Sequence, residues 1–302
     1  MQRFFERYLY APTLFDRILS FVLLPLSGIY CLVVYSAFLR AKERDFGIPI
    51  VGVGNLSVGG SGKTPLVTEL AGRYAHAAIV LRGYGRKSRG LHVVSDAKKV
   101  LCDVATSGDE AMIYAKKLPD CVVIVSEDRD IAIERAKAMG CRVVFLDDGY
   151  SKLHIKKLDI LIDVDTPNRF CLPSGAYRAK EFGKKRALHV KEGVDFTREV
   201  FFVNATEKMS LVSAIAKPNR LLRYIDERVI AHHFFDDHYY FSKEELERIL
   251  REDKSDSLLV TYKDLVKIES FHLPTSLMDM RLRLSDTLVK RVDSYIKEYY
   301  NT

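Results

Sequence analysis

The chain has 302 residues, 48% of them hydrophobic and 29% charged, and these proportions exclude an intrinsically disordered protein. Its length allows one large α/β domain or two smaller ones. A net charge of +7 indicates an anionic partner, either a nucleic acid, a membrane surface or a phosphorylated substrate. Five cysteines are scattered without a C-x-x-C pair, so we expect reduced, buried thiols and no zinc site.

The first predicted element is an apolar segment, residues 18–39, that contains no charged residue. It is as long as the roughly 20 residues that a membrane-spanning helix needs, but Pro25 and Gly28 interrupt it. Basic residues on both sides suit a helix that lies in the headgroup region of an anionic membrane. A buried helix pair broken at Pro25 is the alternative. We expect a membrane-associating helical segment over 1–46, either peripheral or with a single N-terminal anchor.

Apolar runs alternate with helical segments after residue 47, as a parallel sheet with crossover helices requires. The first set predicts strands at 48–53, 77–81, 121–126, 142–146 and 158–163, and helices at 65–75, 108–117 and 129–139. Residues 166–198 are rich in Pro, Gly and basic residues and predict loops and a linker. The second set predicts strands at 199–203, 211–215, 228–234 and 257–261, and helices at 218–226, 242–251 and 286–300. We therefore expect two α/β lobes, over 47–180 and 181–302, with a cleft between them.

Residues 55–65 carry the most informative motif, Asn-Leu-Ser-Val-Gly-Gly-Ser-Gly-Lys-Thr-Pro. It lies between a predicted buried strand and a predicted helix, which is the context of a phosphate-binding loop in a P-loop NTPase-type sheet. Glycines let backbone N–H groups turn toward a phosphate, Lys63 reaches the outer phosphates of a nucleotide, and the Thr64 hydroxyl suits Mg²⁺. The sequence therefore predicts nucleotide phosphate binding by Ser57, Val58, Gly59, Gly60, Ser61, Gly62, Lys63 and Thr64.

Acidic residues follow or precede several of the predicted elements. Asp147 and Asp148 come directly after an apolar run, where a P-loop enzyme holds its metal ion, and we expect them to meet the P-loop because ligands collect at the carboxyl ends of parallel strands. Asp109 and Glu110 open a helix, where capping explains them equally well. His238 follows a strand, where a histidine is more often a surface or packing residue, and the Thr261–Asp264 stretch by itself is typical of a turn.

Together these motifs resemble, over nearly the whole chain, the tetraacyldisaccharide 4′-kinases, also called lipid A 4′-kinases. Three departures bear on substrate recognition: Ser151-Lys152 stand where the family usually has Gln-His, Ser174-Gly175-Ala176-Tyr177-Arg178 where it has Ala-Gly-Pro-Leu-Arg, and Tyr262 where it has Glu. The resemblance rests on residues 53–65, 81–85, 108–110, 146–150, 158–160, 172–175 with Arg178, 214–218, 235–238, and Thr261 with Lys263-Asp264.

The resemblance implies an ATP-dependent kinase of lipid A biosynthesis, which phosphorylates the 4′-hydroxyl of a tetraacylated glucosamine disaccharide 1-phosphate at the cytoplasmic face of the bacterial inner membrane. ATP is then the co-substrate, an anionic glycolipid and the membrane surface are the partners, and neither nucleic acid nor an obligate protein partner is expected. By family analogy, Asp109 would accept the sugar hydroxyl proton, and His238 would orient Asp109 or share that proton. In this reaction Lys63 and the loop amides would hold the phosphates, and Thr64 with Asp147 or Asp148, together with Glu110, would hold Mg²⁺. The candidates to meet the substrate 1-phosphate are cations at motif positions that face the expected cleft, namely Arg82, Arg178 and Lys263.

A P-loop switch ATPase or GTPase, of the metallochaperone or membrane-targeting type, is the alternative function, since the loop suits that class too. It predicts nucleotide-dependent dimerisation, hydrolysis without an acceptor, and a Cys or His pair for metal cargo, which the sequence lacks. A nucleic-acid-binding module is a third reading of the +7 charge, but no aromatic and basic motif of the RNA-binding kinds accompanies it.

Overall fold

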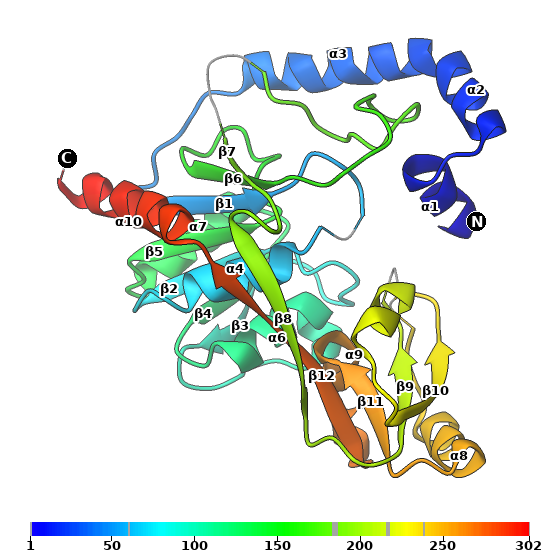
Figure 1. The fold of residues 1–302 in the computed structure, drawn as a ribbon. Helices are drawn as coiled ribbons and strands as arrows, with labels where there is room; N and C mark the ends of the chain where they lie inside the picture. The colour runs from blue at the N-terminus through cyan, green and yellow to red at the C-terminus, as the bar shows by residue number, and fades with distance from the viewer. Residues whose placement is uncertain (1, 60, 183–186, 216–217, 238, 302) are drawn as a thin grey trace. The chain divides into compact units, whose positions relative to one another are not determined.

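The computed structural model describes residues 2–59, 61–182, 187–215, 218–237 and 239–301 (Figure 1). The chain divides into two compact units, each assembled from segments that are far apart in the sequence. The contiguous division into 1–46, 47–180 and 181–302 remains a prediction, and the compact units cut across it. Unit 1 comprises Met1–Lys63, Phe145–Phe196 and Ser285–Thr302, and unit 2 comprises Thr64–Val144 and Thr197–Leu284.

Unit 1 combines N-terminal helices, parallel strands and the C-terminal helix. Strand β1 pairs in parallel with β6, with Val51 opposite Leu158, and β6 pairs in parallel with β7. Its elements are α1 (Gln2–Tyr10), α2 (Leu14–Val22), α3 (Leu24–Arg40), β1 (Ile50–Gly54), most of β5 (Val143–Asp147), β6 (Leu158–Ile162), β7 (Leu188–Val190) and α10 (Asp286–Asn301).

Unit 2 holds the rest of the α/β pattern. Strand β2 pairs in parallel with β4, and β3 pairs with β4 in the antiparallel direction. The elements of this part are α4 (Lys63–Ala71), which begins at the last residue of unit 1, β2 (Ala77–Leu81), β3 (His92–Asp96), α5 (Val104–Ser107), α6 (Asp109–Lys117), β4 (Val122–Val125) and α7 (Arg129–Ala138). The strand order is β3-β4-β2 within unit 2 and β5-β1-β6-β7 within unit 1.

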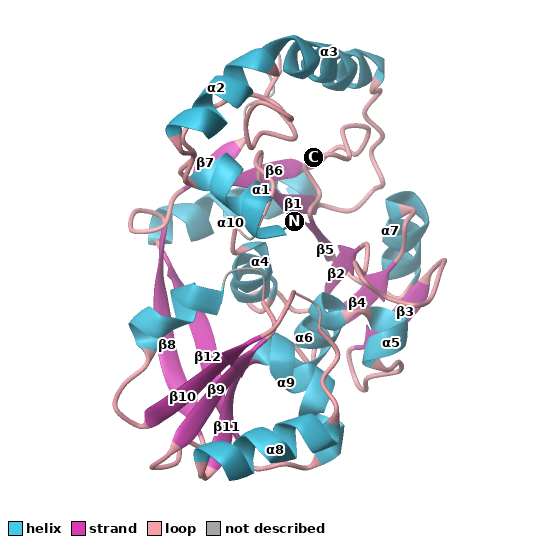
Figure 2. Ribbon diagram, turned by 90° about the vertical axis from the view of Figure 1, so that its right-hand side faces the viewer, coloured by secondary structure: helices cyan, strands magenta, loops and turns pink. Residues whose placement is uncertain are grey.

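A second, five-stranded sheet of unit 2 has the order β10-β9-β11-β12-β8 (Figure 2). Side chains alternate between its two faces, so β9 and β11 send Val212 and Val260 into one core, with Leu246 of α8, and Leu211 and Leu259 into another. Its elements are β8 (Phe196–Val203), β9 (Met209–Ser213), η1 (Pro218–Tyr224), β10 (Val229–Phe234), α8 (Lys243–Asp253), β11 (Ser257–Thr261), α9 (Tyr262–Ile268), η2 (Glu269–Phe271) and β12 (Thr275–Leu284).

The predicted α/β class is confirmed, and the buried strands lie close to their predicted positions. Strands β1, β2, β4 and β5 are buried along their whole length, which is why they appear in the sequence as continuous apolar runs. The segment predicted as helix 218–226 forms the 3₁₀ helix η1, and residues 216–217 before it lie outside the described part. Elements β3, α5, β7, α9, η2 and β12 were not predicted.

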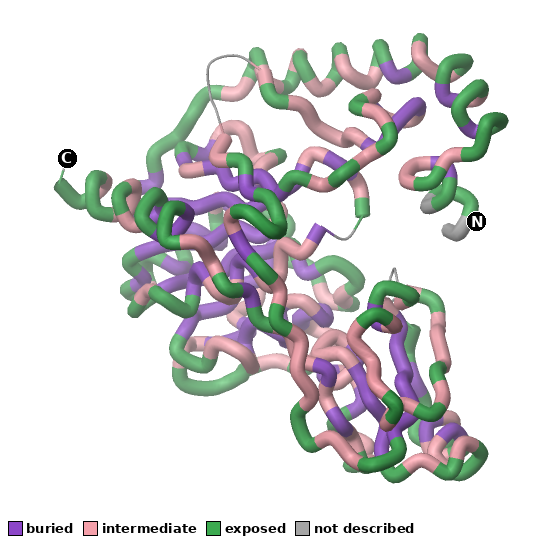
Figure 3. The backbone as a smooth tube through the Cα atoms, in the orientation of Figure 1, coloured by how far each residue is buried: buried purple, intermediate pink, exposed green. Residues whose placement is uncertain are grey.

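The apolar N-terminal segment forms two helices rather than one. Helix α2 ends at Val22, and α3 begins at Leu24 with Pro25 in its first turn, where proline is tolerated. Within the described residues no single helix has the length and composition to cross a membrane, whereas α2 and α3 meet these criteria together, with a bend of 58°. Many of their large apolar side chains are exposed, for example Leu14 (77%) and Leu32 (66%), which does not support a buried helix pair. Along most of both helices the residues are exposed or intermediate (Figure 3).

The expectation that all five cysteines are free thiols is wrong for two of them. Cys31 on α3 forms a disulfide with Cys171, across Cα atoms 6.3 Å apart. A bond between residues so distant in sequence depends on the tertiary fold and leaves no spacing signal. Cys102, Cys121 and Cys141 are free, and burial raises the pKa of the Cys121 and Cys141 thiols to about 11, so both stay protonated at neutral pH.

Candidate active site

The glycine-rich loop begins where β1 ends and leads into α4, as predicted. Gly59 and Gly62 have φ angles of +97° and +85°, which L side chains rarely adopt, and these turns carry the backbone around the loop. Helix α4 then starts at Lys63, so the unpaired N–H groups of its first turn face the loop. Among the described residues the buried Ser61 hydroxyl has no hydrogen-bond partner. Gly60, a predicted ATP ligand, lies outside the described residues.

Lys63 is held at the centre of a polar cluster in unit 1. Its ammonium group donates to Oδ1 of Asn55 at 3.1 Å and lies 3.8 Å from a carboxylate oxygen of Asp148. The guanidinium of Arg178 donates to the same Asn55 oxygen at 3.2 Å and forms an ion pair with Asp148. The side chains of Lys63 and Arg178 are 19% and 35% exposed, so solvent reaches two cations at the end of the phosphate loop. This arrangement suits an anion with several oxygen atoms.

The prediction that the end of β5 meets the P-loop is confirmed within unit 1. Asp147 is the last residue of β5 and is buried, whereas Asp148 turns the chain with φ +55°, a region that Asp tolerates better than most residues. The next amide, that of Gly149, donates to the carbonyl of Val53 in β1. Backbone bonding therefore fixes the Asp148 carboxylate next to Lys63.

The loop of residues 171–178 supports the P-loop from the side of the N-terminal helices. The amide of Val58 donates to the Ala176 carbonyl at 2.9 Å, and the amide of Arg178 donates to the Leu56 carbonyl at 2.8 Å. On its other side, the loop accepts a bond from Ser20 of α2 to the Ser174 carbonyl at 2.5 Å. Ser27 of α3 is buried there too, and its hydroxyl lies 2.7 Å from the Ser174 hydroxyl. One loop therefore contacts both the apolar helices and the phosphate loop.

Asp109 anchors a second polar cluster, in unit 2. It is the first residue of α6, and Gly108 precedes it with φ +82°, where an added Cβ would stand 3.0 Å from the Tyr84 carbonyl oxygen. The Asp109 carboxylate, only 9% exposed, lies 3.5 Å from the ammonium of Lys267 on α9. The positive end of the α6 dipole also favours an anion at this position. Glu110 follows on the same helix and is half-buried.

The other predicted site residues have these positions. Lys263 forms an ion pair with Asp237 at 2.9 Å, and both side chains are 21% exposed. Arg82 directly follows β2 and is exposed. Thr64 is the second residue of α4 and is half-buried. His238 lies outside the described residues, so its predicted pairing with Asp109 stays a prediction.

Two polar residues of these clusters were missed by the sequence reasoning. Asn55 lies within the quoted loop motif, and its position directly after a buried strand was the available signal. Lys267 had only a weak signal, three residues after Asp264 on a helix that was not predicted. Within the described part of the chain, no group of three or more His, Cys, Asp and Glu side chains is arranged to hold a metal ion.

A buried parallel strand, a glycine-rich turn and a lysine at the start of a helix define an α/β protein with a nucleotide phosphate-binding loop. Residues 19–191 and 197–297 match the family described as Tetraacyldisaccharide-1-P 4′-kinase (LpxK). The chain belongs to this family.

Relatives of known name agree with this placement. The chain is 44% identical over 306 residues to the tetraacyldisaccharide 4′-kinase of Aliarcobacter butzleri, with 97% of each chain covered. It is 43% identical over 303 residues to that of Helicobacter acinonychis, with 99% of this chain and 97% of the relative covered. A crystal structure of LpxK from Aquifex aeolicus in complex with ATP has the same fold, with a TM-score of 0.74 and 24% identity over 93% of this chain and 99% of that one.

Proposed function

We propose that this chain transfers the γ-phosphoryl group of ATP to the 4′-hydroxyl of a tetraacylated glucosamine disaccharide 1-phosphate. The observation that carries the proposal is the Lys63 cluster, in a chain whose family is the Tetraacyldisaccharide-1-P 4′-kinases. Phosphoryl transfer requires positioned phosphates, charge stabilisation and an oriented hydroxyl group. Lys63 and the loop amides would hold the β- and γ-phosphates. The acceptor oxygen forms the new bond to phosphorus, the bond to ADP breaks, and the hydroxyl proton passes to Asp109.

Arg178 has a role in this proposal that differs from the one expected from the sequence. It was expected to meet the 1-phosphate of the lipid, yet its guanidinium shares Asp148 and Asn55 with Lys63. We therefore assign it to the phosphate groups of ATP, where a planar guanidinium can bind two oxygen atoms at once. Arg82 and Lys263 remain the candidates for the 1-phosphate.

The oxygen donors at the P-loop fit Mg²⁺. This ion keeps several water molecules and binds through one or two carboxylates together with substrate phosphates, so it does not need an all-protein cage. Asp147, Asp148 and the Thr64 hydroxyl supply donors of this kind, and Glu110 is a further candidate. When bound, the ion neutralises charge on the phosphates; the residues themselves hold it and orient ATP.

We also propose that α2 and α3 attach the protein to the cytoplasmic face of the bacterial inner membrane. Exposed apolar side chains on both helices support this, because a lipid substrate stays in the bilayer. Replacing Leu32 and Val33, which are 66% and 62% exposed, with glutamine should abolish flotation with anionic vesicles. Val194, which is 72% exposed in a turn of unit 1, provides the matched control. Equal loss of flotation in Val194→Gln, or none in the double variant, would count against the anchor.

One assay tests the reaction itself. Purified protein, γ-labelled ATP and the disaccharide lipid in mixed micelles should give label in the lipid fraction, and Lys63→Ala should not. Release of labelled phosphate at the same rate with and without lipid, accompanied by ATP-dependent dimerisation, would instead support the switch ATPase or GTPase.

A further inference from the structure

We propose that Lys267 is a positioning residue for Asp109, holding its carboxylate in the orientation that accepts the acceptor's proton. The inference rests on the proposed function, in which Asp109 is the base. It concerns a lysine to which neither the sequence motifs nor the family comparison gives a role. The contact that carries it is the 3.5 Å separation between Nζ of Lys267 and Oδ2 of Asp109.

This contact is shielded from water on both sides. The side chain of Lys267 is 4% exposed and that of Asp109 is 9% exposed, in contrast to the surface pairs of the same unit. Buried charges interact more strongly than exposed ones, and their geometry is restricted by packing. Helices α6 and α9 also share an apolar core in which Met112 and Ile113 meet Val266, directly before Lys267. The two charged residues therefore come from elements that are packed against each other.

Lys267 is itself held in place by a second carboxylate. Asp264, one turn earlier on α9 and fully buried, lies 4.0 Å from the same ammonium. Asp264 accepts bonds from the Ser213 hydroxyl and the Ala214 amide, at 2.9 and 3.0 Å, and from Thr261, so it cannot swing toward another partner. The ammonium group also donates to the Tyr239 carbonyl at 3.4 Å. Asp264 thus fixes the lysine, and the lysine fixes one oxygen of Asp109.

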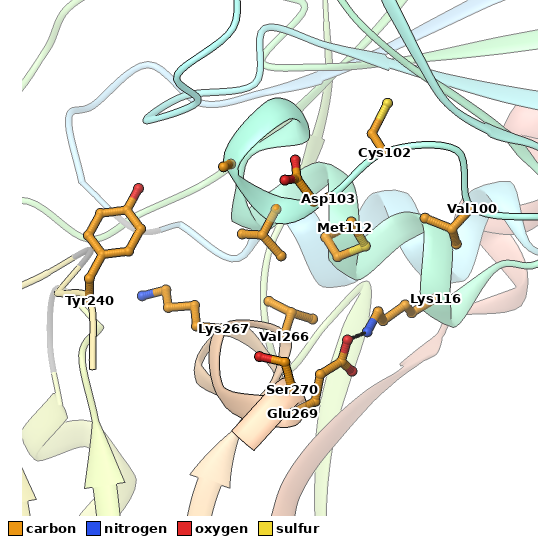
Figure 4. A pocket seen from close by; sticks show the side chains of 12 residues that line it. Val100, Cys102, Asp103, Met112, Lys116, Tyr240, Val266, Lys267, Glu269 and Ser270 are labelled. Carbon is orange, nitrogen blue, oxygen red and sulfur yellow. Dashed lines mark hydrogen bonds and ion pairs between the residues drawn. The ribbon is translucent and has the colours of Figure 1, made fainter. Parts of the chain in front are cut away.

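A pocket of about 500 Å³ lies beside this ion pair and has Lys267 in its wall (Figure 4). Its other charged wall residues are Asp103, Lys116 and Glu269, and the last two form an ion pair with each other. Figure 4 shows Lys267 extending toward the side where Tyr240 lies, away from the Lys116–Glu269 pair. Lys116 therefore serves as the matched control, since it lies in the wall of the same pocket but pairs with Glu269 and not with Asp109.

A positioning role predicts a particular pattern of kinetics. Lys267→Met should lower kcat for lipid phosphorylation by about 10²-fold, as expected when a catalytic group loses its orientation, with ATP affinity unchanged. The KM for the lipid should also stay the same, because Lys267 acts on the proton acceptor and not on substrate binding. Lys267→Arg should restore most of the lost kcat, and Lys116→Met should behave like the unmutated chain.

Non-additivity provides the second measurement. In the Asp109→Asn background, Lys267→Met should cost less than twofold, since a group that acts through Asp109 has nothing left to position. If Lys267→Met melts at a lower temperature than the unmutated chain, Lys267→Gln replaces it in both measurements. Unchanged kcat in a folded Lys267 variant, a change in lipid or ATP affinity alone, or a full further loss in the double variant would overturn the inference. Lack of label transfer by the unmutated chain would instead refute the proposed function.

Discussion

The Ser27→Ala substitution tests how firmly the apolar helices are tied to the loop that supports the phosphate site. The Ser27 hydroxyl accepts from the Ser174 amide at 2.9 Å and lies within bonding distance of the Cys171 carbonyl (2.9 Å) and the Ser174 hydroxyl (2.7 Å). Ser27 and Ser174 are 4% and 1% exposed, so water cannot easily replace the lost partner. Leaving the Ser174 amide and the Ser174 hydroxyl without this partner should cost roughly 2–4 kcal/mol of local stability.

Hydrogen exchange measures this loss directly. At about 1.4 kcal/mol per factor of ten, the amides of Ser174 and Gly175 should exchange roughly 30- to 700-fold faster in Ser27→Ala, provided that the loop opens locally. The experiment is carried out with the Cys31–Cys171 disulfide intact, so that the helix stays close to the loop in both proteins.

Ser36→Ala is the matched control. Ser36 lies on the same helix, but its hydroxyl bonds to the Val33 carbonyl on the exposed side, and its loss should leave exchange in the loop unchanged. If Ser27→Ala exchanges no faster than Ser36→Ala, the buried hydroxyl network does not hold the loop, and the reasoning is refuted.

Three further predictions concern charge. Lys63→Ala should retain the fold but lose turnover by several orders of magnitude, because the charge that compensates the transferring phosphoryl group is gone; lipid phosphorylation at the original rate would remove Lys63 from the site. Asp109→Ala should collapse kcat with little loss of ATP affinity, and adding His238→Ala should cost little more, whereas fully multiplicative losses would argue against a shared role. The pKa of Asp45 is lowered to about 2 by hydrogen bonds from Tyr299, then Lys156 and the Gly47 amide, so its contribution to stability is present above about pH 4 and is lost as the pH falls through 2. Tyr299→Phe should move the Asp45 titration, followed by NMR, up toward its ordinary value, and an unmoved midpoint would contradict this assignment.

The helices and strands that were predicted correctly are those whose own residues, without reference to distant segments, carry the pattern of the element. Strands β1, β2, β4 and β5 are buried on both faces, so their apolar runs do not depend on which neighbour they pair with. Strand β12 was missed because charges at Asp279, Arg281 and Arg283 interrupt its apolar residues, and only its place in the second sheet makes it a strand. Helix α9 was taken for a turn, although Thr261 caps it by accepting from the Asp264 amide.

In the candidate site, too, the sequence predicted some contacts and missed others. The approach of Asp148 to Lys63 follows from a general rule for parallel sheets and was predicted. The contacts of Lys267 and Arg178 join residues separated by long stretches of chain, and they depend on how α6 packs on α9 and how the 171–178 loop returns to the P-loop. No periodicity or spacing in the sequence records such packing, and neither does it record the Cys31–Cys171 bond.

The discontinuous make-up of unit 1 has a consequence for biogenesis. Strand β1 needs β6 as its partner, and Asp45, a few residues before β1, bonds to Tyr299 near the end of α10, so the unit cannot close until α10 has been synthesised. The apolar helices α2 and α3, by contrast, are synthesised first. The nascent chain therefore presents these exposed apolar side chains before Asp148 and Arg178 of the Lys63 cluster are synthesised. Pairing over such sequence separations is slow, so under the proposed attachment through α2 and α3 the chain would meet the membrane before its phosphate site forms.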